Sequence, residues 1–409
     1  MSLKQETKPS KLNPPSRDWS SYTTVLSENV DLEGSTWCLG LISDMNMMAF
    51  QHSLKALIKQ TEHRNVFFEP DFLAQSAKWI ARRQIQGLYL AEKLPSGIEL
   101  KFFAPVTIER TGKVGPKFFR VWSTEFSPLG QPIVDSTDME RTVEELFKAF
   151  DQMPVSSAHG ILINSLPVGT RFYSNFVKAG EKRQRLQFFN QFERAALLPT
   201  GSKPYDQVHL SGKRRQRLRV GLERLIEIGD VCLEEATDVQ DIEIAMLDFL
   251  FLEKRGWKGR RSTALANNNA TRQFAMDMIR NLGSEKNCRV FSYKLDGNTI
   301  ASMIVLGSRG RYITWKIAFD EHYAKQSVGN LLLVDVNNRL TSEQDFEFLD
   351  SVAVPGNETA NRFWPDRLKV CSIALGFAKS SPNMPLYIAR NLSIYGILKR
   401  KIRKLLKRH

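Results

Sequence analysis

The stretch Arg311-Tyr-Ile-Thr-Trp-Lys-Ile-Ala-Phe319, with the polar loop and Gly329 that follow it, decides the fold. Its nine residues are apolar and rich in β-formers, which predicts a strand. Apolar residues at helical spacing predict a helix over 330–340, and Phe346-Glu-Phe-Leu349 predicts a short second strand. A glycine at such a strand-to-helix corner lets backbone N–H groups face a phosphate. We therefore expect the chemistry of this chain at this corner.

The size of the chain indicates more than one domain. It has 409 residues, of which 42% are hydrophobic, and two folded domains are the natural expectation. No apolar run reaches the roughly 20 residues that a membrane-spanning helix needs. We predict a disordered leader over 1–34, folded domains over 35–204 and 205–390, and a separate tail over 391–409.

The tail carries much of the positive charge. The net charge is +14, and the tail contributes seven basic residues and no acid, with leucines and isoleucines between them at near-helical spacing. That pattern is typical of a basic amphipathic helix that binds an anionic membrane surface or another polyanion. The alternative is a solvated helix that packs on the domain through its leucines.

The cysteines and histidines show no metal-binding pattern. None of the four cysteines forms a C-x-x-C pair, and the six histidines lack ligand spacing. Buried thiols in a reducing cytoplasm are the expectation, without a structural metal. The chain is thus predicted to be cytoplasmic, with its tail at the inner face of the membrane.

Strands and helices alternate along the whole chain, which favours an α/β or α+β fold. The second half repeats the order of strands and helices of the first half. It contains a hairpin across Asp296-Gly297 and a strongly basic helix over 209–228. Glu69-Pro-Asp-Phe72 is interpreted as a turn. The repeated order indicates two similar halves, each a mixed twisted sheet flanked by helices.

Four segments carry a resemblance to a known family. They are Phe251-Leu-Glu-Lys-Arg-Gly-Trp-Lys-Gly259, Ala318-Phe-Asp320, Tyr323-Ala-Lys-Gln-Ser-Val-Gly329 and Phe346–Leu349. Together they resemble the GNAT-superfamily acetyltransferase domain of the cellulose-biosynthesis (CelD-like) type. The resemblance covers about 205–375 and implies tandem GNAT-like halves, as in the Fem-type aminoacyltransferases.

The sequence departs from the family pattern at three positions. Val328 stands where the family has proline, and Glu347 stands where aspartate is usual. The phosphate motif is met at Gln326 and Gly329, but Leu331 replaces its last small residue. These departures bear on whether the ligand is retained more than on the fold.

The resemblance implies acyl-CoA as co-substrate, without a metal. Its pyrophosphate would meet the unpaired N–H groups at the start of the 330–340 helix. The candidate residues are Gln326, Ser327, Val328, Gly329 and Asn330. The alternative for Ser327 is a helix N-cap with no ligand.

Transfer of an acyl group to an amine needs a base and a proton donor for the leaving thiolate. No nucleophile–histidine pattern is visible, which favours direct transfer in a ternary complex. Asp350 is the preferred base and Glu347 the second candidate, and strand alternation places them on opposite faces. Tyr323 is the candidate proton donor, and the alternative is a half-buried aromatic residue.

The acceptor side is implied by the resemblance. Trp257, Lys258 and Arg260 would line the acceptor cleft, and Trp364 and Arg367 would shape it from the other side. The alternative is that Trp257 packs against the helix end and Lys258 pairs with an acid.

Three functions follow as hypotheses. The first is an N-acyltransferase that moves an acyl group from acyl-CoA to an amine on a sugar, lipid or polysaccharide precursor. The second is an aminoacyl-tRNA-dependent Fem-like transferase, which would use the basic helix over 209–228 to bind tRNA. The third is a non-catalytic GNAT-like scaffold that binds a membrane or a protein partner.

Overall fold

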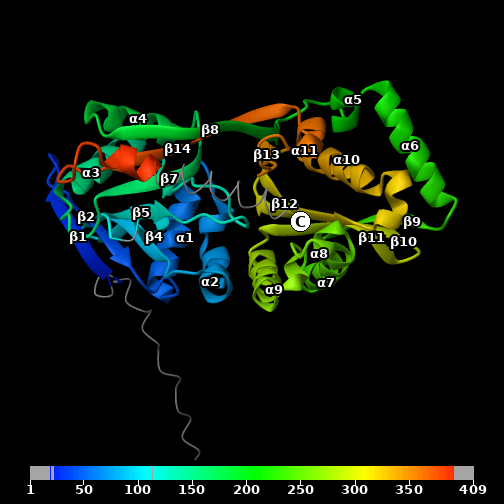
Figure 1. Cartoon of the computed structure of the whole chain (residues 1–409), viewed down its shortest axis with the longest axis horizontal. Coiled ribbons are helices and arrows are strands. Elements are labelled where there is room, and N and C mark those ends of the chain that lie inside the picture. The colour runs from blue at the N-terminus through cyan, green and yellow to red at the C-terminus, as the bar shows by residue number, and fades with distance from the viewer. Residues whose placement is uncertain (1–18, 20–22, 113, 391–409) are drawn as a thin grey trace, which may run out of the picture.

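The computed structural model describes residues 19, 23–112 and 114–390, and these form one continuous mixed sheet with helices on both faces (Figure 1). The strand order is β1-β2-β3-β4-β5-β7-β14-β8-β13-β12-β11-β10-β9, with β6 paired to β4. The strands are β1 (Thr23–Val30), β2 (Thr36–Ile42), β3 (Gln86–Leu94), β4 (Gly97–Arg110), β5 (Lys117–Val121), β6 (Ile133–Val134), β7 (Gly160–Pro167), β8 (Leu186–Leu197), β9 (Val231–Ala236), β10 (Cys288–Leu295), β11 (Asn298–Ser308), β12 (Arg311–Phe319), β13 (Phe348–Asp350) and β14 (Asp366–Gly376).

The two halves of the chain repeat one order of elements. Each half has a strand, a pair of helices, three antiparallel strands, a helix and then a strand parallel to the last of the three. The longer helices are α1 (Met48–Gln60), α2 (Pro70–Trp79), α3 (Met139–Gln152), α4 (Arg171–Lys182), α6 (Gly212–Ile226), α7 (Val239–Arg255), α9 (Asn269–Ser284) and α10 (Val328–Thr341). Short helices are α5 (Tyr205–His209), α8 (Trp257–Arg260) and α11 (Glu358–Phe363), with 3-10 turns η2 (Val66–Phe68), η3 (Leu265–Asn267) and η4 (Glu321–Gln326). The tandem α/β architecture of two similar halves, predicted from the sequence, is confirmed.

The halves exchange one strand each. β14, from the C-terminal half, pairs with β7, whereas β8, from the N-terminal half, pairs with β13. β14 and β8 also pair with each other in antiparallel fashion, and Figure 1 shows them bridging the two halves. A boundary at 204/205 therefore separates the helices but not the strands, because each sheet half is completed by the other half of the chain.

Helix packing joins the halves on one face of the sheet. α2 and α9 lie against each other, and the rings of Phe72 and Phe274 meet edge to face with centroids 5.5 Å apart. Burying such aromatic pairs is the main source of stability at a contact of this kind. Among the described helices, none combines the length and the hydropathy needed to cross a bilayer.

Four details differ from the sequence-based expectations. The leader predicted over 1–34 is too long, because β1 begins at Thr23 and pairs with β2. The turn expected at residues 69–72 is the start of α2, where Pro70 occupies the first helical position that proline favours. The basic helix expected over 209–228 is α6, which spans only 212–226, and Cys232 is exposed although Cys38, Cys288 and Cys371 are buried. The tail over 391–409 lies outside the described residues.

Candidate functional site

The sheet opens where β12 and β13 part. The two strands are parallel neighbours only from Arg311 to Ile313, after which β12 continues to Phe319 while the other strand ends at Asp350. A bulge in β12 at Trp315 bends the longer strand at this point, as bulges beside active sites commonly do. The two diverging chains leave a cavity of about 580 Å³, here called the wedge cavity, which is a size typical of ligand sites.

The floor of the wedge cavity is the start of α10. Ser327 adopts a left-handed conformation at φ 59°, which turns the chain from η4 into α10. Its carbonyl accepts the first bonds of the helix, from the N–H groups of Asn330 and Leu331. The N–H groups of Val328 and Gly329 come before these first helical bonds and have no acceptor within the helix. The positive end of the helix therefore faces the cavity. An anionic group fits this corner.

Gly329 is needed for packing as well. A Cβ at this position would lie 2.9 Å from Cδ1 of Phe319, whose ring also lines the cavity. Glycine therefore lets the end of β12 and the start of α10 approach each other closely.

Two of the three departures from the family motif lie in the core. Val328 is fully buried and Leu331 is 5% exposed, and both pack in the cluster beneath α10. The Leu331 side chain does not line the wedge cavity, so it fills the core without obstructing the corner. Gln326 does not line the cavity either, and its carbonyl lies against Gly221 of α6.

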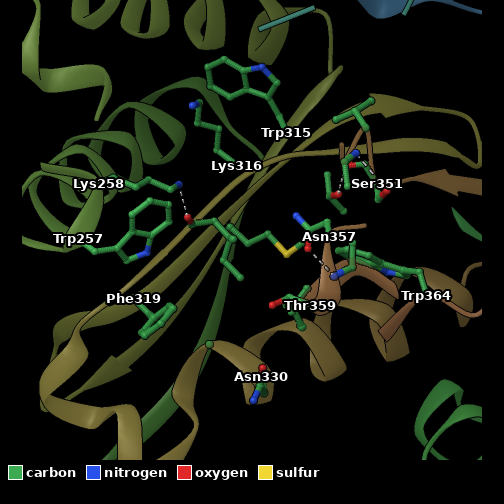
Figure 2. A pocket seen from close by; sticks show the side chains of 18 of the residues that line it. Trp257, Lys258, Trp315, Lys316, Phe319, Asn330, Ser351, Asn357, Thr359 and Trp364 are labelled. Atoms are coloured by element: carbon green, nitrogen blue, oxygen red, sulfur yellow. Dashed lines mark hydrogen bonds between the residues drawn. The ribbon is translucent and has the colours of Figure 1, made fainter. Parts of the chain in front are cut away.

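One wall of the wedge cavity is cationic. Lys258 Nζ donates to the carbonyl of Ile317 at 2.8 Å (Figure 2), and it also donates to Glu253 Oε1 at 3.0 Å. The Glu253 side chain is fully buried and also accepts the N–H of Leu265 at 2.8 Å. Lys258 thus pairs with an acid, as the alternative interpretation expected, and lines the cavity as the resemblance implied.

The opposite wall comes from the chain after β13. Ser351 and Asn357 lie there in Figure 2, together with Thr359 and Trp364. The indole of Trp364 is 5% exposed and donates from Nε1 to Asn337 Oδ1 at 3.0 Å. Trp364 is therefore a rigid part of this wall.

Sequence reasoning missed the two other ionisable residues that line the wedge cavity besides Lys258. Lys316 follows the bulge in β12, and Glu125 reaches the cavity from the loop after β5 in the N-terminal half. Trp315 Nε1 donates to the carbonyl of Phe126 at 2.9 Å, which holds that loop over the cavity. Lys316 was visible as the lone lysine of an apolar strand, whereas no local pattern marks Glu125.

Burial lowers the pKa of Lys316. The side chain is 18% exposed, and its ammonium lies 5.2 Å from the ring centroid of Phe126. Loss of hydration is the largest cause of the lower pKa, while the carboxylates of Glu253 and Glu125 act in the opposite direction. Lys316 is therefore closer to its neutral form than an exposed lysine.

We expect Lys316→Met to remove a pH dependence of stability. At pH values between the lowered pKa of Lys316 in the folded state and its ordinary pKa of 10.5, the unfolded chain binds more protons than the folded chain. The free energy of unfolding of the wild type therefore rises with pH in this window, relative to the variant. Urea unfolding from pH 7 to pH 10 measures this, with exposed Lys325→Met as the control. The expectation is contradicted if the free energies of unfolding of the variant and the wild type differ by the same amount at every pH.

The two predicted carboxylate bases lie elsewhere. Asp350 is 3% exposed, pairs with the buried guanidinium of Arg194, and lines a second cavity of about 200 Å³ between the halves. The Glu347 side chain is 58% exposed and pairs with Arg311 at 2.6 Å, before β13 begins. The expectation that one of these acids faces the cleft is therefore corrected, because the cleft opens only beyond Asp350.

Three other predicted residues do not line the wedge cavity. Tyr323 is half-buried in η4 and packs beside the core, as its alternative interpretation expected. Arg260 is exposed and forms a two-point ion pair with Glu321 at 2.7 and 3.0 Å. Arg367 donates to the carbonyls of its own turn. The predicted residues that do line the cavity are Trp257, Lys258, Ser327, Val328, Gly329, Asn330 and Trp364.

A family comparison agrees with this geometry. The family model "Acetyltransferase (GNAT) domain" matches residues 212–359, which include β12, α10 and β13. Residues 212–359 are therefore similar to a GNAT-type acetyltransferase domain. The family match and the tandem fold support an acyltransferase. No curated protein sequence matches the chain.

Solved structures share the fold of the whole chain at low identity. FemX is 11% identical with a TM-score of 0.53, covering 83% of this chain and 98% of its own. A conserved protein of unknown function from Bacteroides thetaiotaomicron is 11% identical with a TM-score of 0.51, covering 80% and 97%. The C-terminal domain (DUF2156) of a protein named as a lysylphosphatidylglycerol synthetase of Agrobacterium fabrum is 13% identical with a TM-score of 0.50, covering 79% and 90%. These likenesses concern the fold alone.

Proposed function

We propose that the protein is an N-acyltransferase that moves an acyl group from acyl-CoA to an amine. The observation that carries the proposal is the wedge cavity, which opens between two parting parallel strands with a helix N-terminus at its floor. Its volume, its cationic wall and its anion-binding corner suit a long ligand with a phosphate group.

The residues of the cavity fit acyl-CoA, which would supply the activated acyl group. The N–H groups of Val328 and Gly329 would bind its pyrophosphate. Beyond Ile313 the outer edge of β12 has no strand partner among the described residues, so its backbone can bind amides of the ligand. Phe319 and the indole of Trp364 would shield the reacting end from water.

Glu125 is the proposed base. Of the described residues that line the wedge cavity, it alone carries a carboxylate. A carboxylate in the cavity can take the proton that an ammonium acceptor must lose before it attacks. Lys316, whose pKa is lowered by burial, lies near enough to interact with it electrostatically. The two halves of the chain would thus share one active site.

Calorimetric titration with acetyl-CoA and longer acyl-CoAs tests the proposal. We expect binding, and we expect Asn330→Asp to weaken it about tenfold, because the new charge at the cavity floor repels the pyrophosphate. The same charge suits the first turn of a helix, so thermal stability should not fall. Asn269→Asp makes the matched change in the first turn of α9, away from the cavity, and should leave binding unchanged. A folded wild-type protein that binds no acyl-CoA would exclude the proposal.

The acceptor is proposed on chemical grounds. An amine on a sugar, a lipid or a polysaccharide precursor fits an acyltransferase of this architecture, and the lysylphosphatidylglycerol synthetase domain of Agrobacterium fabrum favours a lipid among these. The CelD-like type, the cytoplasmic location and the membrane contact of the tail over 391–409 stay predictions.

A second candidate is transfer from an aminoacyl-tRNA. α6 packs against η4, so its basic side chains lie beside the corner at the cavity floor. Arg215 donates to three carbonyls of the preceding segment and is structural, which leaves Lys213, Arg217 and Arg224 exposed for phosphates. This candidate predicts tRNA binding with a steep salt dependence that weakens when these three are neutralised. Absence of tRNA binding at low salt would remove it.

A further inference from the structure

The outer face of α7 exposes a row of apolar side chains. Ile244, Leu247 and Phe251 are 60%, 49% and 61% exposed, although the opposite side of the same helix packs in the core. Their spacing of three and four residues places them on one face of the helix. Trp257, which is 45% exposed, continues the row onto α8. These four side chains are here called the α7–α8 face, and exposed apolar side chains grouped in this way are a feature of interaction sites.

Cations surround the aromatic end of the α7–α8 face. The guanidinium of Arg255 lies 5.2 Å from the ring centroid of Phe251, and that of Arg261 lies 5.3 Å from the ring centroid of Trp257. Lys254 is exposed beside them. Within the described part of the chain, these three cations form no salt bridge, whereas the nearby Arg260 is neutralised by Glu321.

The other end of the face is acidic. Asp241 is exposed at the start of α7, and half-buried Asp248 accepts the hydroxyl of Thr299 at 2.7 Å. The positive charge is therefore concentrated where the two aromatic rings are exposed. This distribution of charge favours an anionic partner at the aromatic end of the face.

We propose that the α7–α8 face docks on an anionic lipid surface. Exposed aliphatic side chains can enter the boundary of the acyl chains, while tryptophan favours the headgroup region. Unpaired arginine and lysine at the same edge meet lipid phosphates, each adding to the attraction. An apolar row with cations at its aromatic end matches this chemistry, and it is a different segment from the tail over 391–409, for which the sequence predicted membrane contact.

Docking would place the wedge cavity at the lipid surface. Trp257 belongs both to the α7–α8 face and to the lining of the cavity. An amine carried on a lipid headgroup would then reach the cavity without leaving the membrane. This consequence rests on the proposed acyl transfer, whereas the docking itself does not.

Co-sedimentation of the full chain with vesicles tests the docking, without any acyl-CoA. We expect binding to vesicles that contain phosphatidylglycerol and much weaker binding to pure phosphatidylcholine. Leu247→Ser combined with Phe251→Ser should weaken binding at least about tenfold, because two apolar anchors are lost. Leu32→Ser combined with Val155→Ser removes two exposed apolar side chains of the N-terminal half and should have no effect. Arg255→Gln combined with Arg261→Gln should reduce the preference for phosphatidylglycerol.

Three outcomes would overturn the docking. One is wild-type protein that stays in solution with either vesicle. Another is a Leu247/Phe251 double variant that binds as tightly as wild type, which would assign binding to another segment such as the tail. The last is a lipid-free dimer in sedimentation velocity that the double variant abolishes, which would make the face an interface between two copies. Titration of acyl-CoA into the same double variant distinguishes a failure of the docking from a failure of the proposed function, because the cavity floor is unchanged in this variant.

Discussion

Asp350→Asn is expected to destabilise the protein by about 3–5 kcal/mol, because it leaves a buried charge without its partner. The side chains of Arg194 and Asp350 are 1% and 4% exposed, and they join β8 to β13 across the strand exchange. Arg194 Nη1 also donates to the carbonyl of Pro128, and Asp350 Oδ1 accepts the N–H of Val352 at 2.8 Å. Asparagine keeps the shape of the side chain, but it removes the charge and replaces one of the two acceptor oxygens with an amide donor.

Urea unfolding measures this effect, with Glu347→Gln as the matched control. The Glu347 side chain is 58% exposed in its pair with Arg311, so its loss should change the free energy of unfolding by less than about 1 kcal/mol. Both acids were candidate bases on sequence grounds, so the comparison also tests that assignment. An Asp350→Asn protein with wild-type stability and no acyl transfer would instead support a role for Asp350 in the reaction.

Glu125→Gln is expected to lower kcat for acyl transfer about 10²–10⁴-fold, with the affinity for acyl-CoA unchanged. Glutamine fills the same space but cannot take the proton of the ammonium acceptor. The loss should shrink at higher pH, where more of the acceptor amine is already neutral. Steady-state kinetics from pH 7 to pH 9.5, together with calorimetric titration of acyl-CoA, give both quantities.

Glu227→Gln is the control for this prediction, because Glu227 is exposed and does not line the wedge cavity. Its kcat should equal that of the wild type. A Glu125→Gln variant with wild-type kcat at every pH would exclude Glu125 as the base. A variant that instead binds acyl-CoA poorly would assign Glu125 to ligand binding.

The corner of the site was predictable because its signals are local. The apolar run 311–319, Gly329 and the helical spacing after it lie within one stretch of sequence, and the structure forms β12 and α10 there. Asp350 was predicted to face the cleft on the same local grounds. Its actual partner, Arg194, is 156 residues away and gives no local signal. The direction of that side chain depends on the pairing of β13 with β8.

The sequence by itself determined the order of strands and helices, the repetition of the two halves and the strand-to-helix corner at Gly329, because each depends on periodicity and backbone preference over a few residues. Only the tertiary structure decided which side chains meet in the wedge cavity. The exchange of β8 and β14 between the halves, and the contact of Trp315 with the loop that carries Glu125, bring together residues far apart in the chain. Such contacts arise from packing of whole elements, for which no short pattern of residues exists.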